Sequence, residues 1–304
     1  MRGSWTDCMK VGIIHFMAYP QTMKGEGPIL ETLEKIAADE FFDCVEITTI
    51  KDDKVREEAR DLLATSGLTV AYGAQPRLLG GKLDLNHGFE AERQKAVAEM
   101  KAAIDEAKYM GAVGCAFLSG KDAPDESGRP AAWGRLKDSV LELCAYAEGF
   151  PLVMESFDYD VDKCCLAGPN AACAEFVRDV RQTCPQFGLM VDLSHFPLQH
   201  EATDDALEAV KDVLVHAHMG NCVMKDGAPG TGDQHPRFGY PNSENDAGDV
   251  AAYLQGLQRI GYLGPSRPLV SFEVKPAEGE CPDLVVANAK RTLKDAWARM
   301  RCCC

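Results

Sequence analysis

Metal-binding residue types end four short apolar runs in the second half of this sequence. Glu155 lies in the run VMES, Asp192 in MVDLSH, His218 in VHAHMG and Glu273 in VSFEV, each at the C-terminal end of its run. Carboxylate oxygens together with one imidazole nitrogen suit a hard or borderline divalent cation. If the four runs are neighbouring strands whose ends meet, the sequence predicts one site for Mn²⁺, Co²⁺, Mg²⁺ or Zn²⁺.

Other polar residues lie at or near the ends of such runs, or, in the case of Arg237, in the long loop that follows one of them, and we expect them to contact a substrate. They are His15, His195, His216, Lys275 and Arg237. His195 comes three residues after Asp192, where its imidazole could take part in catalysis by binding a substrate oxygen. His216 points to the same side of its strand as His218, because side chains two residues apart share a face. We assign the metal to His218, which lies nearer the end of the strand, with His216 as the alternative ligand.

Each of the four metal candidates also has a purely structural explanation. A glutamate at a strand end, such as Glu155 or Glu273, can interact with the N-terminus of a neighbouring helix. Asp192 can be a helix cap, and His218 can be a hydrogen-bonded core histidine. The metal interpretation is favoured because all four residues recur at the same place in four successive runs.

The predicted positions of these residues depend on a repeating order of strands and helices along the chain. Short apolar runs bounded by glycine, proline or polar residues are typical of buried parallel strands. We predict strands over residues 10–16, 44–48, 69–74, 114–119, 151–156, 188–193, 213–219 and 268–274. We predict amphipathic helices after them, over residues 29–40, 53–67, 89–111, 133–149, 170–184, 203–213, 245–261 and 282–300.

Eight strand–helix units predict an α/β protein with a single (β/α)8 TIM barrel. In that fold the C-terminal ends of all strands meet on one face, where active sites lie. The competing architecture is an open doubly wound sheet, which would often carry a G-x-G-x-x-G turn that this chain lacks. The long segment 221–244 precedes a helix, and we expect it to cover the substrate.

The two ends of the chain fall outside this repeat. We expect residues 1–8 to be an N-terminal extension, 9–301 to form the barrel, and 302–304, three consecutive cysteines, to be a tail. The first residues lack the apolar core of a signal peptide, so a cytoplasmic location is expected. The cysteines have no C-x-x-C spacing, and we expect reduced thiols.

Composition narrows the expected partners. The net charge of −15 argues against sequence-independent binding of nucleic acid, which depends on basic contacts to phosphates. No apolar run reaches the roughly 20 residues that span a bilayer. We therefore expect a small-molecule substrate and neither nucleic acid nor membrane as a partner. The sequence is compatible with a homo-oligomer or a second subunit.

Taken together, the motifs resemble the xylose isomerase-like TIM barrels, the sugar isomerase and epimerase superfamily also called AP endonuclease family 2. The resemblance rests on Glu155 in VMES, Asp192 and His195 in DLSH, His218 in HAHMGN and Glu273 in SFEV. By resemblance to ketose 3-epimerases of this family, the four metal candidates are expected to bind Mn²⁺ or Co²⁺, with Mn²⁺ preferred. The resemblance also implies that Glu155 and Glu273 exchange the substrate proton and that His195 contacts substrate oxygens.

Two departures from the ketose 3-epimerase pattern affect the expected substrate. Those enzymes carry a second glutamate six residues after the first, where this chain has Val161. They also carry an arginine six residues after the metal histidine, where this chain has Met224. The substrate is therefore not expected to be a simple free ketohexose bound in their manner.

The expected reaction is metal-dependent removal of a proton next to the carbonyl of a keto-sugar or related polyol. Return of the proton gives isomerisation or epimerisation. Loss of a β-leaving group after the same step would instead make the protein a lyase, as in relatives that act on 3-oxo-glycosides or inososes. Two further classes are a metal-dependent endonuclease, which would need a basic channel, and a non-catalytic sugar-binding barrel, which would need no metal.

Overall fold

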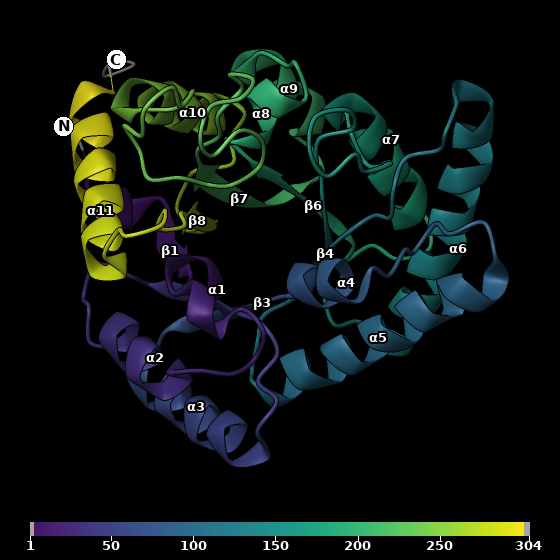
Figure 1. Ribbon diagram of the computed structural model, residues 1–304, viewed down its shortest axis with the longest axis horizontal. Helices are drawn as coiled ribbons and strands as arrows, with labels where there is room; N and C mark the ends of the chain where they lie inside the picture. The colour runs from purple at the N-terminus through teal and green to yellow at the C-terminus, as the bar shows by residue number, and fades with distance from the viewer. Residues whose placement is uncertain (1–2, 301–304) are drawn as a thin grey trace.

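The computed structural model describes residues 3–300, and its parallel strands close into a barrel (Figure 1). Each strand pairs with its sequence neighbours, and β8 pairs with β1 to complete the ring. The predicted (β/α)8 barrel is confirmed. The strands are β1 Lys10–Ile14, β2 Cys44–Ile47, β3 Thr69–Gly73, β4 Cys115–Leu118, β5 Leu152–Glu155, β6 Gly188–Asp192, β7 Leu214–Gly220 and β8 Leu269–Glu273.

Long helices follow the strands and form an outer layer around the barrel (Figure 1). They are α2 Ile29–Ala37, α3 Asp53–Ser66, α5 Glu90–Tyr109, α6 Arg129–Ala147, α7 Asn170–Arg181, α9 Thr203–Val210, α10 Ala247–Arg259 and α11 Pro282–Arg299. The sequence predicted all eight. The start of α6 differs most: it begins at Arg129 rather than at 133. Pro130 lies in its first turn, where a missing backbone N–H removes no helical hydrogen bond.

Three short helices were not predicted, and each begins within three residues of a strand end. They are α1 His15–Ala18, α4 Gln75–Gly81 and α8 His195–Leu198. Figure 1 shows α1 and α4 inside the ring of longer helices, toward the centre of the barrel. Short 3-10 turns occur at Trp5–Asp7, Pro20–Thr22 and Glu126–Gly128. A helix of one or two turns has too few residues for a clear periodic pattern.

Local signals in the sequence explain several helix ends. The Asp52 carboxylate accepts hydrogen bonds from the backbone N–H groups of Lys54 and Val55 at the start of α3. The same helix ends at Gly67, whose φ of 72° is in the left-handed region that favours glycine. A reciprocal capping box between Asp246 and Asp249 begins α10.

The strands are buried on both faces, as the apolar runs predicted. The main core lies between strands and helices and includes fully buried side chains such as Ile13, Phe117 and Leu189. A smaller cluster of Ala116, Val153 and Met190 lies on β4, β5 and β6. Layers of this kind fill the interior of such barrels, so the interior is packed rather than open.

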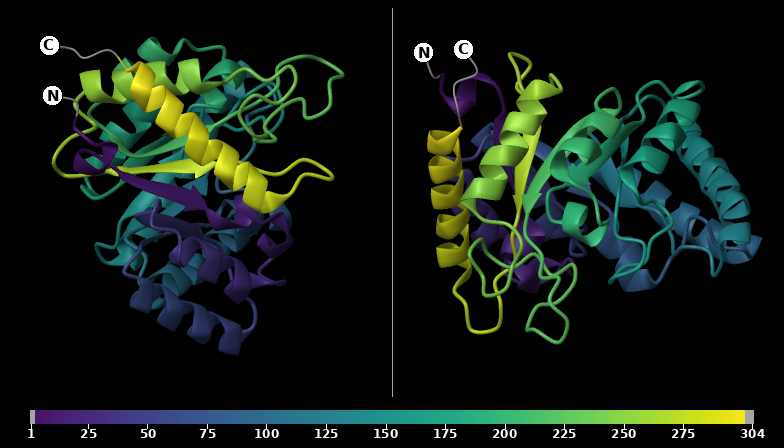
Figure 2. Two further views of the ribbon diagram at one scale, coloured as in Figure 1. Left: turned by 90° about the vertical axis from the view of Figure 1, so that its left-hand side faces the viewer. Right: turned by 90° about the horizontal axis from the view of Figure 1, so that it is seen from above.

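One end of the barrel carries the long loops. In the right-hand view of Figure 2, the loops that follow β7 and β8 project from one end, and α11 ends at the other. Near that other end, Trp5 packs on Phe41 and Trp297 with ring centroids 5.7 and 6.3 Å apart. The predicted cysteine tail at 302–304 lies outside the described residues. Within residues 3–300, no helix has the length and apolarity needed to cross a membrane.

Candidate metal centre

The four predicted metal ligands meet at the C-terminal ends of β5 to β8. Glu155, Asp192, His218 and Glu273 each contribute one ligand-type atom, and these atoms all lie within 4.8 Å of one another. The three carboxylates are the last residues of β5, β6 and β8. His218 on β7 is level with Asp192 in the register of β6 and β7. We call these four residues the rim cluster.

Two carboxylate oxygens of the rim cluster are buried without a hydrogen-bond partner. They are Glu155 Oε1 and Asp192 Oδ2. The second oxygen of each is engaged: Gln75 Nε2 donates to Glu155 Oε2 at 2.7 Å, and the Ser194 backbone N–H donates to Asp192 Oδ1 at 2.6 Å. Asp192 does not cap the following helix α8, whose N-cap is Ser194, and its Oδ2 has no hydrogen-bond partner. Unpaired buried carboxylate oxygens are costly in free energy, so this arrangement fits a bound cation.

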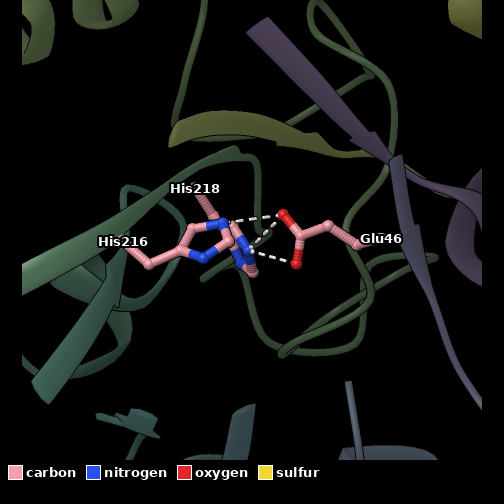
Figure 3. A group of neighbouring side chains, drawn as sticks. All are labelled: Glu46, His216 and His218. Carbon is pink, nitrogen blue, oxygen red and sulfur yellow. Dashed lines mark hydrogen bonds and ion pairs between the residues drawn. The ribbon is translucent and has the colours of Figure 1, made fainter. Parts of the chain in front are cut away.

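The orientation of His218 also fits a cation. Its Nε2 lies 3.1 Å from Glu46 Oε1 and its Nδ1 lies 2.9 Å from Glu273 Oε2 (Figure 3 shows the Glu46 side). Because a carboxylate only accepts, Nε2–H donates to Glu46. Nδ1 then faces Glu273 and, at 3.7 Å, Glu155 Oε1. The lone pair on Nδ1 and the carboxylate oxygens around it repel one another, so a positive charge is needed among these atoms. A proton or a metal ion can supply that charge.

His216 lies deeper in the barrel than the strand ends, where we predicted that it would contact substrate. Its Nε2 donates to Glu46 Oε1 at 2.8 Å, so Glu46 accepts from both histidines (Figure 3). We call Glu46, His216 and His218 the inner cluster. His216 lines a second cavity of about 380 Å³, beside residues at strand starts such as Leu269. Two residues along a strand keep the side-chain face but change the depth, and the expected substrate contact of His216 therefore has no support in this geometry.

Opposite charges shift the pKa values of these buried groups. Burial raises the pKa of Glu273 to about 7, against the opposing effect of His235 and His218. Burial alone would lower the pKa of His218, but Glu46 and the rim carboxylates raise it well above its usual value. The pKa values of Glu46 and Asp192 are lowered despite burial, because imidazoles lie beside them. Protonated histidines thus supply the positive charge that a metal ion could supply in their place.

A second polar group adjoins the rim cluster. His195 Nδ1 donates to the Ser156 carbonyl oxygen at 2.8 Å, and its Nε2 lies 3.2 Å from Asp233 Oδ1. His235 Nε2 is 2.8 Å from the same oxygen, and Lys163 Nζ is 3.1 Å from Asp233 Oδ2. Burial opposes ionisation of His195, but Asp233 raises its pKa to about 10. His195 is therefore held between the backbone and Asp233, and its contact with substrate stays a prediction.

In the described part of the chain, three groups of residues have ligand atoms close enough together to hold a metal ion. They are the rim cluster, the inner cluster and the trio Asp192, His195 and His235. The inner cluster and the trio each share a residue with the rim cluster. Among the three, the rim cluster alone contains two unpartnered carboxylate oxygens within residues 3–300. The rim cluster is therefore the favoured metal position.

A cavity of about 630 Å³ opens beside the rim cluster and is lined by Glu155, His218 and Glu273. Lys275, predicted to contact substrate, also lines it. Acidic side chains are as numerous as lysines and arginines in its lining, which also includes the imidazoles of His218 and His235. The acidic residues are Glu46, Glu99, Glu155, Asp233 and Glu273, and the others are Lys24, Lys51, Arg77, Lys163 and Lys275. This cavity therefore differs from the basic channel that an endonuclease would need.

The side chains of His15 and Arg237 are hydrogen-bonded to residues outside the rim cluster. His15 Nε2 lies 2.7 Å from Thr32 Oγ1 of α2, and burial lowers the pKa of this imidazole to about 3. The chain turns into α1 at His15, so its neighbours Ile14 and Phe16 line the cavity instead. Arg237 Nε donates to Glu280 Oε1 at 2.8 Å. The geometry thus gives no support to a substrate contact by either residue.

Four residues that shape the centre were not predicted: Glu46, Gln75, Lys163 and Asp233. Glu46 had a signal, since it is the one charged residue in the buried run CVEI. Its partner His216 lies 170 residues away, a pairing that no local pattern contains. Asp233 and Lys163 lie in irregular loops. The Asp158 carboxylate organises one of these loops by accepting from the backbone N–H groups of residues 161 to 164.

The fold and the rim cluster together define a class: a parallel α/β barrel with a carboxylate and imidazole centre at the C-terminal ends of its strands. A family model described as "Xylose isomerase-like TIM barrel" matches residues 35–295. The chain belongs to this family, and the resemblance drawn from the sequence is confirmed.

Curated relatives of the chain are sugar 3-epimerases. Fructoselysine 3-epimerase of Shigella flexneri is 30% identical over 162 residues, which are 52% of this chain and 55% of that protein. The corresponding protein of Escherichia coli O157:H7 is also 30% identical, over 52% of this chain and 56% of that protein. The match thus spans about half of each relative.

Solved structures share the whole fold at low sequence identity. D-psicose 3-epimerase from Clostridium cellulolyticum H10, solved with D-tagatose, has a TM-score of 0.69 at 19% identity and covers 97% of this chain and 100% of its own. The IOLI protein with a bound zinc atom has a TM-score of 0.73 at 17% identity, with the same coverage. A D-tagatose 3-epimerase-like protein has a TM-score of 0.72 at 18% identity and covers 96% and 100%. At these identities the likeness supports the fold alone.

Proposed function

We propose that this protein is a divalent-metal-dependent sugar epimerase or isomerase that removes a proton next to the carbonyl of a keto-sugar. The observation that carries the proposal is the pair of unpartnered oxygens, Glu155 Oε1 and Asp192 Oδ2, in a cluster that also holds an imidazole and a third carboxylate. The curated relatives named as fructoselysine 3-epimerases support a sugar substrate.

The rim cluster would hold the cation, and three carboxylates with one imidazole favour Mn²⁺ over a softer ion. A bound divalent cation would supply Lewis acidity, which stabilises negative charge on substrate oxygens. The chain's own groups would position and move the proton. Glu155 and Glu273 both line the cavity, come from strands β5 and β8, and each presents a carboxylate oxygen there.

The two glutamates are proposed to act from different sides of the reacting carbon. One removes the proton and the other returns it, which inverts the carbon. Gln75 fixes Glu155 through its 2.7 Å hydrogen bond to Oε2, leaving Oε1 for the substrate side. Lys275 and Lys163 line the same cavity, and we propose that they contact substrate oxygens.

Metal removal followed by isotope exchange tests the proposal. The protein is dialysed against EDTA, and deuterium uptake from D₂O into D-fructose, D-psicose, D-tagatose and fructoselysine is followed by NMR with and without added Mn²⁺. We expect uptake at the carbon beside the carbonyl only with metal present, and restoration at about one ion per chain.

Two outcomes would contradict the proposal. Exchange that is unchanged after complete removal of metal would exclude a metal-dependent reaction. Stoichiometric sugar binding with no exchange under any metal would favour a non-catalytic sugar-binding barrel. Co²⁺, Mg²⁺ and Zn²⁺ are compared with Mn²⁺ in the same assay, because the ion that gives the highest rate identifies the preferred metal.

A further inference from the structure

The second cavity lies at the starts of the strands, at the end of the barrel opposite the rim cluster, and has a volume of about 380 Å³. Its lining includes Leu269, the first residue of β8, and Gly114 and Pro151, which come directly before β4 and β5. Val113 and Val215 also line it and are 51% and 40% exposed. The cavity therefore opens at the molecular surface.

Small side chains leave this space unfilled. Bulky branched residues usually fill the interior of such a barrel. Here the lining contains Ala71 on β3, Gly114 before β4 and Ala116 on β4. Ala116 and Val153 of the smaller apolar cluster form part of the wall. The cavity is therefore a largely apolar space that the packing of the barrel does not close.

His216 presents a hydrogen-bond acceptor to this apolar space. The residue lines the cavity and is 5% exposed. Its Nε2 donates to Glu46 at 2.8 Å, and Figure 3 shows the other ring nitrogen, Nδ1, on the side away from Glu46. Within residues 3–300, Nδ1 has no hydrogen-bond partner. Because the hydrogen of the neutral ring is on Nε2, Nδ1 carries a lone pair that needs a donor.

The inner cluster forms the partition between the two cavities. Glu46 is the one residue that lines both cavities in the described chain, while His218 lines the cavity at the rim and His216 lines the second cavity. The same oxygen, Glu46 Oε1, lies 2.8 Å from His216 Nε2 and 3.1 Å from His218 Nε2. A contact made to His216 therefore reaches the proposed metal ligand through a single shared acceptor.

These features define the chemistry of a matching ligand. An apolar lining favours an apolar body, and the volume is at the small end of the roughly 300–1,000 Å³ range of ligand sites. A charged ligand would lose its hydration without gaining a counter-charge, because both imidazoles already donate to Glu46. The other polar side chains of the lining are Tyr72, whose hydroxyl donates to Glu106, and Gln186, which is partly exposed.

We infer that this cavity is a second binding site, for a small neutral molecule with an apolar body and one hydroxyl group that donates to His216 Nδ1. Its occupant acts on the metal centre through Glu46. The site itself goes beyond the proposed function, and only its link to the metal centre rests on that function.

A matched pair of probes tests the site. Binding of phenol and of fluorobenzene, which has nearly the same size and no O–H group, is measured by calorimetry at neutral pH. We expect phenol to bind at least about threefold more tightly, since one net hydrogen bond separates the two probes. The ¹⁵N signal of the His216 imidazole is followed in the unaltered protein, and we expect phenol to shift it more than fluorobenzene does.

Two variants locate the bound probe. Val113→Trp places a large ring at the mouth of the cavity and is expected to weaken phenol binding by about tenfold or more. Leu284→Trp is the matched control, because Leu284 is 67% exposed on α11 and lies outside both cavities. His216→Phe keeps a ring and removes the acceptor, so we expect it to bind the two probes equally. The ¹⁵N measurement needs no substitution and stays decisive if His216→Phe does not fold.

The link to the metal centre has a defined direction. A donor on Nδ1 makes the His216 Nε2–H a stronger donor to Glu46, and the shared carboxylate then accepts less strongly from His218. His218 becomes a weaker ligand as a result. We expect saturating phenol to weaken Mn²⁺ binding by about twofold, and Mn²⁺ to weaken phenol binding by the same factor, since coupling between two sites is reciprocal.

The outcomes separate the site from its link and from the proposed function. Phenol that does not bind, or binds no more tightly than fluorobenzene, would overturn the site and leave a cavity that holds only water. Phenol binding that Val113→Trp does not weaken would also overturn it. Phenol binding at this site with unchanged Mn²⁺ affinity would overturn the link alone. Phenol binding that meets every expectation, in a protein that exchanges no deuterium, would support the site and contradict the proposed reaction.

Discussion

The rim cluster and the inner cluster both combine carboxylates with imidazoles and share His218, yet their hydrogen bonding differs. In the inner cluster, both imidazoles donate to Glu46, and both oxygens of that carboxylate lie within 3.3 Å of an imidazole nitrogen. In the rim cluster, Glu155 and Asp192 each keep one buried oxygen without a partner. The inner cluster satisfies both oxygens of its carboxylate, whereas the rim cluster leaves two oxygens without a hydrogen-bond partner, and these are the oxygens that we propose bind a cation.

The difference has a simple structural origin. The inner cluster lies within the barrel, where side chains from β2 and β7 meet and the buried carboxylate must find its partners in the protein. The rim cluster lies at the strand ends and lines the cavity. The same chemistry therefore supports two roles: the inner cluster orients His218, and the rim cluster is available to a ligand.

The largest expected effect comes from Glu155→Gln, which removes one proposed proton carrier and one metal ligand of the rim cluster. We expect the rate of deuterium exchange to fall by about a thousandfold or more. The melting temperature should stay the same or rise, since a buried charge is replaced by an isosteric amide. Exchange kinetics and thermal unfolding are measured together, with the exposed Glu34→Gln as the control. A variant that retains exchange would remove Glu155 from the mechanism.

An intermediate effect is expected from Gly220→Ala, which alters the rim cluster without removing a ligand. A Cβ at this position would lie 2.6 and 2.7 Å from the two Asp192 carboxylate oxygens. Asp192 must then move, and we expect affinity for Mn²⁺ to fall by about a hundredfold. Metal titration by calorimetry measures this, with Gly264→Ala as the control because no heavy atom lies within 4 Å of its added Cβ. Unchanged affinity would show that Asp192 is not a ligand.

The smallest effect is expected from Glu46→Gln in the inner cluster. The amide can accept from one imidazole but presents an N–H to the other, so His218 loses part of its orientation. Affinity for Mn²⁺ is expected to fall by about tenfold, while the exchange rate at saturating metal stays near that of the unaltered protein. Loss of exchange even at saturating metal would mean that Glu46 acts on substrate, and the distinction between the clusters would fail.

The fold and the meeting of the four candidate ligands could be predicted because their signals are local. A buried parallel strand gives a short apolar run, and the polar residue that ends it marks the active face. Glu155, Asp192 and Glu273 are the last residues of their strands, as their positions in the sequence indicated. His15 shows the limit of that rule, since a short helix begins at this residue and its imidazole contacts α2.

The sequence by itself determined the order of strands and helices, the closure into a barrel and the residue types at the strand ends, because these depend on periodicity and on which face of a strand is buried. Tertiary structure alone decided that Glu46 contacts His218 from β2 and that Asp233 lies against His195. Those contacts join residues far apart in the chain, and their geometry depends on loop paths that carry no repeating pattern.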